Sequence, residues 1–289
     1  MTQAQKFLAF DTSTDMMSVA LSHGDQTWHH HGVGGAKASA QLIPTLHSLL
    51  AQAQLQLSDL TALVVGQGPG SFTGLRTACA VAQGLALGAN LKVIPVDSLK
   101  AVAEDARQTL VDRTPSFPSS NASNLLDAPQ AFKDWHVASV MDARMGEVYV
   151  GIYGWQANTS RWTTVHPLQV GSPEAMSAQL SRMKLPNLVL AGNGFEVYKE
   201  RFPLQELESQ GVPMVCVAAV PHALALLRMA PALWANQEAV APEWVQPLYI
   251  RDKVAQTTAE RDAIKLANAH AHANPLAHVL PSTTSSSPT

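Results

Sequence analysis

The chain has 289 residues, of which 46% are hydrophobic and 14% charged, and its formal net charge is −3. This length suits one large domain or two lobes with a shared core. The sequence has no stripe of lysines and arginines of the kind that would indicate a nucleic-acid surface. The only cysteines, Cys79 and Cys216, exclude a disulfide framework and a cysteine-based zinc finger. Because the sequence has neither a signal segment nor an apolar run of about 18 residues, we expect a cytoplasmic protein without a membrane partner.

Strand patterns at residues 7–10 and 17–21 flank a turn of aspartate and hydroxyl residues, which predicts a β-hairpin. The turn residues Asp11, Thr12 and Ser13 resemble the phosphate-binding hairpin of actin-like and acetate-kinase-like ATPases. Thr12 stands where that pattern usually has glycine, and its Cβ would crowd a phosphate. A plain hairpin turn is the alternative interpretation. Residues 28–33 predict a third strand, on which three adjacent histidines alternate between faces and cannot all bind one metal ion.

Residues 39–53 predict an amphipathic helix. Its apolar positions recur at helical spacing and form one face, which consists of Leu42, Leu46, Leu49, Leu50 and Ala53. Pro44 stands early in this segment, where it either begins the regular helix or kinks its first turns.

The next motif runs from Val64 to Arg76 and predicts a buried strand, a glycine-rich turn and a helix that reaches about residue 88. A helix N-terminus after such a turn offers free N–H groups to an anion. Gly68, Gly70 and Ser71 are therefore candidate phosphate-binding residues, although the Walker A lysine is missing. The alternative is a tight strand-to-helix turn with Ser71 as the helix N-cap.

The predicted helix after this turn has a stripe of small residues every four positions. The stripe consists of Gly74, Ala78, Ala82 and Ala86, and larger apolar residues flank it. Another helix could approach such a stripe closely, although the helix must also cover its own sheet. Together with the leucine face of residues 39–53, it predicts an interface with a partner protein, formed by Leu42, Leu46, Leu49, Leu50, Gly74, Leu75, Ala78, Val81, Ala82 and Leu85.

The second half repeats the mixture of strands and helices. A strand at 93–96 precedes a helix that begins near Ser98, and residues 109–134 predict a loop rich in proline and serine. Strands at 136–141 and 147–153 flank a second polar turn, in which Asp142 stands where the second lobe of an actin-like ATPase has its matching hairpin. Further strands at 188–190 and 214–217 and a helix at 221–234 follow.

These elements predict an α/β fold of two lobes, with mixed sheets flanked by helices. We assign residues 1–107 and about 218–250 to the first lobe and residues 108–217 to the second. Residues 254–289 are rich in alanine, histidine, serine and proline, and we expect a disordered tail. We expect the helix at 221–234 to fold back onto the first lobe.

Five segments resemble, in this order, the bacterial TsaB (YeaZ) family: LAFDTSTDMMSVAL, VVGQGPGSFTGLRTACAVAQGLALG, IPVDSLKAVAE, MDARMGEVYVGIY and VQPLYIRDKVA. The resemblance covers about residues 7–255. It departs from the family before Leu42, where relatives often have a histidine and a glutamate and this chain has Ala38 and Ala40 around Ser39.

The resemblance implies the two-lobed fold of actin-like (ASKHA) ATPases and a non-catalytic paralogue of the catalytic subunit TsaD, without its metal-binding histidines. It implies that the chain binds TsaD and works with the ATPase TsaE, and that it forms a homodimer when alone. The complex would transfer threonylcarbamoyl to N6 of adenosine 37 in tRNAs that read ANN codons, and this chain would meet tRNA only through the complex. We expect no tightly bound cofactor and no metal, with weak ATP or ADP binding in the assembled complex left open.

Two other functions stay open. A nucleotide-dependent phosphotransferase of the actin or acetate-kinase type would use Asp11, Asp142 and the glycine turn. A peptidase is the third alternative, but the sequence has neither an HExxH zinc motif nor a GxSxG nucleophile elbow.

Overall fold

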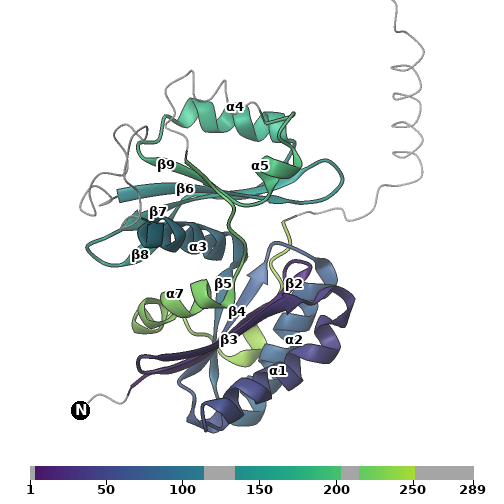
Figure 1. Ribbon diagram of the computed structural model, residues 1–289, viewed down its shortest axis with the longest axis vertical. Coiled ribbons are helices and arrows are strands. Elements are labelled where there is room, and N and C mark those ends of the chain that lie inside the picture. The colour runs from purple at the N-terminus through teal and green to yellow at the C-terminus, as the bar shows by residue number, and fades with distance from the viewer. Residues whose placement is uncertain (1–3, 114–133, 203–214, 251–289) are drawn as a thin grey trace, which may run out of the picture. The chain divides into compact units, whose positions relative to one another are not determined.

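The computed structural model describes residues 4–113, 134–202 and 215–250, and residues 1–250 form one compact unit. This unit contains two five-stranded sheets, with strand orders β3-β2-β1-β4-β5 and β10-β9-β6-β7-β8 (Figure 1). The first sheet consists of β1 (Lys6–Asp11), β2 (Met16–His23), β3 (Gln26–Val33), β4 (Ala62–Gly68) and β5 (Lys92–Asp97). The second consists of β6 (Asp134–Asp142), β7 (Val148–Gln156), β8 (Arg161–Gly171), β9 (Leu188–Ala191) and β10 (Val215–Val217).

The two sheets have the same topology. In the first, β1 pairs antiparallel with β2 and parallel with β4, and in the second β6 pairs antiparallel with β7 and parallel with β9. Both sheets are therefore mixed, and each begins with a hairpin. This repetition confirms the predicted α/β class with two similar successive halves.

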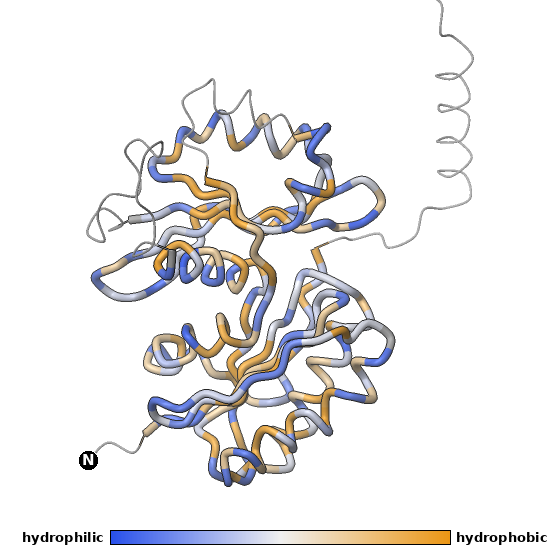
Figure 2. Tube along the Cα trace, viewed as in Figure 1, coloured by the Kyte–Doolittle hydropathy of each residue, from blue (hydrophilic) through white to orange (hydrophobic). Residues whose placement is uncertain are grey.

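Helices cover both faces of the first sheet. Leu8 and Phe10 pack with α1 (Ala38–Gln52) and α2 (Phe72–Ala89), whereas Phe7 and Ala9 pack with α7 (Ala223–Ala235). Successive strand residues point to opposite faces, so β1 is buried on both sides and reads as a continuous apolar run (Figures 1 and 2). The packing of α7 on the first sheet confirms the predicted return of this helix.

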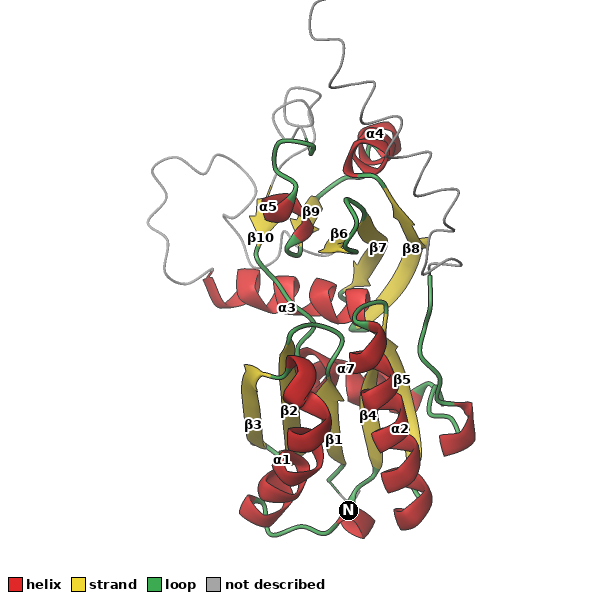
Figure 3. Ribbon diagram, turned by 90° about the vertical axis from the view of Figure 1, so that its right-hand side faces the viewer, coloured by secondary structure: helices red, strands yellow, loops and turns green. Residues whose placement is uncertain are grey.

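The second sheet is covered in the same way. One face packs against α3 (Ser98–Arg113), and the other packs against α4 (Pro173–Met183) and α5 (Gly194–Val197). Figure 3 shows α3 and α4 on these two sides of the strands. The apolar residues of α3 are thus buried in the core of the second sheet, although the helix follows directly after the last strand of the first sheet.

Most predicted elements are present, with three differences. Residues 109–113 continue α3, so the helix extends into the predicted loop, while residues 114–133 lie outside the described part of the chain. Strand β8 and the helices α4 and α5 were not predicted. Pro44 lies inside α1, which begins at Ala38, so it does not begin the helix, and the alternative of a kink in the first turns stays a prediction. The predicted tail at 254–289 lies outside the described residues, and the lobe boundaries stay a prediction.

Candidate functional site

Both oxygens of the Asp11 carboxylate accept hydrogen bonds from other residues of the chain. Asp11 is the last residue of β1 and is 1% exposed. Its Oδ1 accepts hydrogen bonds from the backbone N of Ser13 at 2.7 Å and from Ser13 Oγ at 2.6 Å. Its Oδ2 accepts from Ser98 Oγ at 2.9 Å. Both carboxylate oxygens therefore have partners from the turn itself and from the beginning of α3.

The glycine-rich turn between β4 and α2 lies directly on the Asp11–Ser13 turn. The N–H of Ser71 donates to the carbonyl of Ser13 at 2.7 Å, and Thr12 Oγ1 donates to the carbonyl of Gly74 at 2.8 Å. Ser71 is the N-cap of α2, as the alternative interpretation predicted, and its Oγ accepts from the N–H of Gly74. The two turns are thus joined by backbone and hydroxyl hydrogen bonds.

The glycines in this motif are needed because the two turns touch. A Cβ at Gly66 would lie 1.8 Å from Asp11 Oδ2, and a Cβ at Gly70 would lie 2.3 Å from the Ser13 carbonyl oxygen. At Gly74 it would lie 1.9 Å from the Thr12 carbonyl oxygen. Real side chains do not tolerate such distances, so close backbone packing accounts for these glycines. We call the contact between residues 11–13 and 66–74, with Ser98, the aspartate–glycine junction.

Burial raises the pKa of two groups, Asp11 at this junction and Cys79 on α2. It raises the pKa of Asp11, although the hydrogen bonds from Ser13 and Ser98 act in the opposite direction. It also raises the pKa of Cys79 to about 12, with a smaller contribution from the charge of Asp11. Cys79 is therefore an unreactive buried thiol at neutral pH.

The second polar turn holds Asp142 outside this junction. Asp142 Oδ1 accepts from the Arg144 N–H at 2.8 Å and from the Tyr198 hydroxyl at 2.7 Å. Arg144 forms ion pairs with Asp142 and with Asp15 of the first hairpin, each at 3.2 Å. Arg144 therefore connects the two hairpin turns.

The predicted candidates for phosphate binding are brought together only in part. Asp11, Thr12, Ser13, Gly68, Gly70 and Ser71 meet at the junction, and Asp142 belongs to the other turn. Ser98 was predicted only as a helix cap, because nothing in the sequence shows that it bonds Asp11, 87 residues away. Phosphate binding by these residues stays a prediction.

The predicted partner interface needs a correction. Most of its residues are buried inside the chain's own core: Leu42, Leu46, Leu49, Leu50, Gly74, Leu75, Ala78 and Ala82. Val81 and Leu85 are partly buried against the same core. A helix in an α/β layer must bury its apolar face on its own sheet, so these side chains cannot form the exposed centre of a docking surface.

The outer faces of α1 and α2 present a different set. Leu87 is 75% exposed and Ile43 is 40% exposed. Gly84 and Gly88 are exposed, and a Cβ built on either would meet nothing within 4 Å. Leu87 lies three residues after Gly84, on the same side of α2. We call Ala80, Gly84, Leu87 and Gly88 the outer face of α2.

No metal site or membrane span was found in the described segments. In residues 4–113, 134–202 and 215–250, no group of three or more His, Cys, Asp or Glu side chains is placed to hold a metal ion. Within the same ranges, no helix combines the length and the apolar character that crossing a bilayer requires. His29, His30 and His31 are exposed on β3, and the ring of His31 stacks on His222 at 4.6 Å.

The fold and the junction define an α/β protein with two mixed sheets of repeated topology and a packed aspartate–glycine turn. A family model described as TsaD, tRNA N6-adenosine threonylcarbamoyltransferase, matches residues 33–259. The chain is 31% identical to the tRNA threonylcarbamoyladenosine biosynthesis protein TsaB of Haemophilus influenzae, over 86% of this chain and 94% of that protein. It is 30% identical to the Escherichia coli TsaB, over 86% of this chain and 96% of that protein.

A solved structure leads to the same family. The structure of YeaZ from Pseudomonas aeruginosa is 32% identical to this chain, with a TM-score of 0.65, and the match covers 85% of this chain and 99% of that one. The chain therefore belongs to the TsaB (YeaZ) family of tRNA threonylcarbamoyladenosine biosynthesis proteins, as its motifs predicted.

Proposed function

We propose that this chain is a non-catalytic subunit of the complex that makes threonylcarbamoyladenosine in tRNA. It binds the catalytic subunit TsaD, which transfers threonylcarbamoyl to N6 of adenosine 37 in tRNAs that read ANN codons. The ATPase TsaE belongs to the same complex, and this chain contacts tRNA only through it. The cytoplasm is the proposed location. Membership of the TsaB family and the match to the TsaD family model support this role.

The observation that carries the non-catalytic role is the packing of the aspartate–glycine junction. The repeated sheet topology supports a relationship to the actin-like ATPases, in which an aspartate at this position would hold a metal ion beside a nucleotide phosphate. Here both oxygens of Asp11 accept hydrogen bonds from Ser13 and Ser98, and the glycine-rich turn lies on the Ser13 carbonyl. The chain's own backbone and hydroxyls thus fill the space beside this carboxylate.

The outer face of α2 is the part of the molecule that supports partner binding. Small residues at positions 80, 84 and 88 allow a second helix to approach closely, and Leu87 offers an apolar anchor beside them. We propose that TsaD docks here and on the adjoining side of α1 around Ile43. The same face would form the homodimer when the chain is alone.

Two variants of α2 test this surface. Leu87→Asp places a charge on the anchor, and Gly84→Leu fills the open space without touching the core. Loss of an interface anchor costs about 2 kcal/mol or more, roughly 30-fold in affinity. Binding to purified TsaD, measured by calorimetry, should weaken by at least this factor in both variants. Val197→Asp is the matched control, because Val197 is 52% exposed on α5 of the second sheet.

Sedimentation of the isolated chain adds a second readout, since both α2 variants should also shift the homodimer towards monomer. Unchanged affinity for TsaD in folded Leu87→Asp and Gly84→Leu would show that the partner binds elsewhere.

Reconstitution tests the reaction itself. TsaD, TsaE, tRNA and this chain together should yield modified adenosine 37, and omission of this chain should abolish the product. The phosphotransferase alternative predicts instead that the isolated chain binds Mg-ATP at the aspartate–glycine junction and turns it over. We propose that the isolated chain binds no nucleotide tightly at the junction.

A further inference from the structure

A second polar region lies near Trp155, at the end of β7 that is farther from the Asp142 turn. A cleft of about 430 Å³ is formed by α3, α7 and the hairpin between β7 and β8. Its lining residues include Lys100, Arg107, Arg161, Arg228, Trp155 and Trp162. This volume lies within the range of small-molecule sites.

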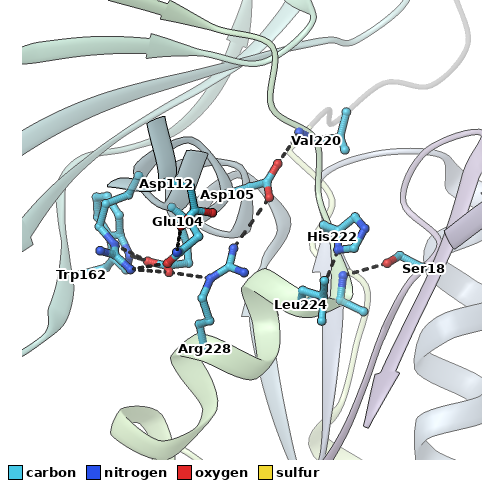
Figure 4. A network of polar contacts seen from close by, with 12 residues as sticks. Ser18, Glu104, Asp105, Asp112, Trp162, Val220, His222, Leu224 and Arg228 are labelled. Carbon is cyan, nitrogen blue, oxygen red and sulfur yellow. Dashed lines mark hydrogen bonds and ion pairs between the residues drawn. The ribbon is translucent and has the colours of Figure 1, made fainter. Parts of the chain in front are cut away.

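A buried glutamate holds one wall of the cleft in place. Glu104 of α3 has a side chain that is 2% exposed, and Arg107 binds it through Nε and Nη2 at 2.9 and 2.8 Å. Arg228 of α7 donates to Glu104 from Nε at 2.9 Å, and Trp162 of β8 donates from Nε1 at the same distance. Figure 4 shows Arg228 and Trp162 converging on this carboxylate. Two guanidinium groups are thus fixed in position by one negative charge.

The cleft has an excess of positive charge. Lys100, Arg107, Arg161 and Arg228 line it, whereas only Glu104 and Glu238 supply carboxylates. Asp105, outside the lining, also lies 3.7 Å from Arg228, and Arg161 pairs with Glu238 at the same separation. Asp97, also outside the lining, interacts electrostatically with Lys100. The lining itself has four cations and two carboxylates, in a chain whose net charge is −3. A group with several anionic oxygens would complement these guanidinium groups.

The remaining walls are aromatic and apolar. The rings of Trp155 and Trp162 lie 5.2 Å apart, and the guanidinium of Arg107 covers the Trp155 ring at 4.4 Å. Met229, Ala232 and Leu233 of α7 add apolar surface to the lining. A flat ring packs well on indole and methyl groups, while its charged substituent reaches the arginines.

We propose that this cleft is a binding site for a nucleoside phosphate, with the phosphate near Arg161, Arg228 and Lys100 and the base against Trp162 and α7. The carrying observation is a fixed cationic wall beside an aromatic wall in one small cavity. The site is separate from the aspartate–glycine junction and from the outer face of α2. The proposed binding site does not rest on the proposed function, because a non-catalytic subunit and an enzyme could both bind a nucleotide in this cleft.

Calorimetric titration of the full chain with AMP, at low and at physiological salt, tests the proposal. Inorganic phosphate and adenosine, titrated separately, show whether the anion and the ring both contribute. AMP should bind at least about tenfold more tightly than either, and its affinity should fall as salt screens the arginines. Equal affinity for AMP and phosphate, or for AMP and adenosine, overturns the assignment of a two-part ligand.

Variants locate the bound AMP. Arg161→Ala removes a 46% exposed cation whose ion pair with Glu238 is long, at 3.7 Å, so the fold should survive. This change should weaken AMP binding about tenfold. Lys100→Met should act in the same direction. Arg182→Ala removes an exposed arginine of α4 outside the cleft and should leave the affinity unchanged. If AMP binds all three variants as it binds the wild type, or fails to bind the wild type at low salt, the cleft is not a nucleotide site.

Discussion

Gly74 and Gly84 lie on the same helix but meet different surroundings. Gly74 faces the first hairpin, where a Cβ would lie 1.9 Å from the Thr12 carbonyl oxygen. Gly84 faces away from the core, and a Cβ there would meet nothing within 4 Å. Glycine is therefore required at position 74, where two backbone segments approach closely, whereas the space around position 84 would also admit a side chain.

Alanine substitutions at these two glycines should have opposite effects on stability. Gly74→Ala forces the Asp11–Ser13 turn away from α2 and should lower the free energy of unfolding by more than about 2 kcal/mol. Gly84→Ala should raise it by up to about 1 kcal/mol, because alanine loses less backbone entropy in a helix. Urea denaturation of both variants measures the difference. A Gly74→Ala protein as stable as the wild type would show that the junction is loosely packed.

His222 is a titratable helix cap. Its Nδ1 accepts from the Leu224 N–H at 3.2 Å at the beginning of α7, and Ser18 Oγ accepts from the Ala223 N–H at 2.9 Å (Figure 4). Burial lowers the pKa of His222 to about 4, and His31, Arg228 and His29 add to the effect. An imidazole nitrogen can accept the cap hydrogen bond only while it is unprotonated, so the cap and the lowered pKa agree.

The stability of the chain should therefore depend on pH through His222. The unfolded histidine takes up a proton near its ordinary pKa of about 6.5, whereas folded His222 stays neutral down to about 4. The unfolded state binds more protons in this window, so the free energy of unfolding falls as the pH decreases through it. His222→Asn keeps a capping acceptor and should reduce this slope, measured by denaturation at several pH values. His47→Asn, at an exposed position of α1, should keep the wild-type slope.

At the scale of elements, Glu104 joins three segments that are distant in the chain. It lies on α3 and accepts hydrogen bonds from its neighbour Arg107, from Arg228 of α7 and from Trp162 of β8. Removal of one partner of a buried ion pair leaves the other charges unpaired in a poorly solvated place. Glu104 therefore links α3 to α7, which packs on the first sheet, and to β8 of the second sheet.

Glu104→Ala should lower the free energy of unfolding by about 3–5 kcal/mol, because two arginines lose their buried partner. The matched control is Glu174→Ala on α4, which removes an exposed carboxylate bound to Arg201 at 2.6 Å. Its effect should be much smaller, since solvent screens such pairs. Denaturation curves of the two variants give the comparison. Equal losses of stability would mean that burial of Glu104 does not matter.

Across the whole molecule, packing of α3 and α7 joins the two sheets. Residues 1–250 form one compact unit. The α3 helix is buried on the second sheet and contacts α7, which is buried on the first. The hydroxyl of Tyr153 on β7 donates to Asp97 at the end of β5, and burial raises the pKa of both groups.

We expect the two sheets to unfold together. Because α3 packs on the second sheet and also contacts β4, β5 and α7, loss of one sheet exposes apolar surface of the other. Urea transitions followed by tryptophan fluorescence and by far-ultraviolet circular dichroism should coincide. Two separated transitions would show that the halves are independent domains.

Local patterns in the sequence explain why much of this fold was predictable. Several features are visible within a few neighbouring residues, namely the apolar runs of β1 and β4, the spacing of leucines in α1 and the serine cap of α2. Strand β8 was missed because its exposed residues give little apolar alternation. The signal for α4 was available in Ser172 and Pro173, which cap and begin that helix.

The α/β class, the two hairpins, the glycine-rich turn and the family could all be inferred from the amino-acid sequence. These features depend on backbone propensity, on hydrophobic period and on short motifs. The three-dimensional structure was needed to show which face of α1 and α2 is buried and that Ser98 completes the partners of Asp11. It was also needed to show that Glu104, Arg228 and Trp162 line one cleft. Burial and hydrogen bonding depend on distances between residues far apart in the chain, and no local pattern records those distances.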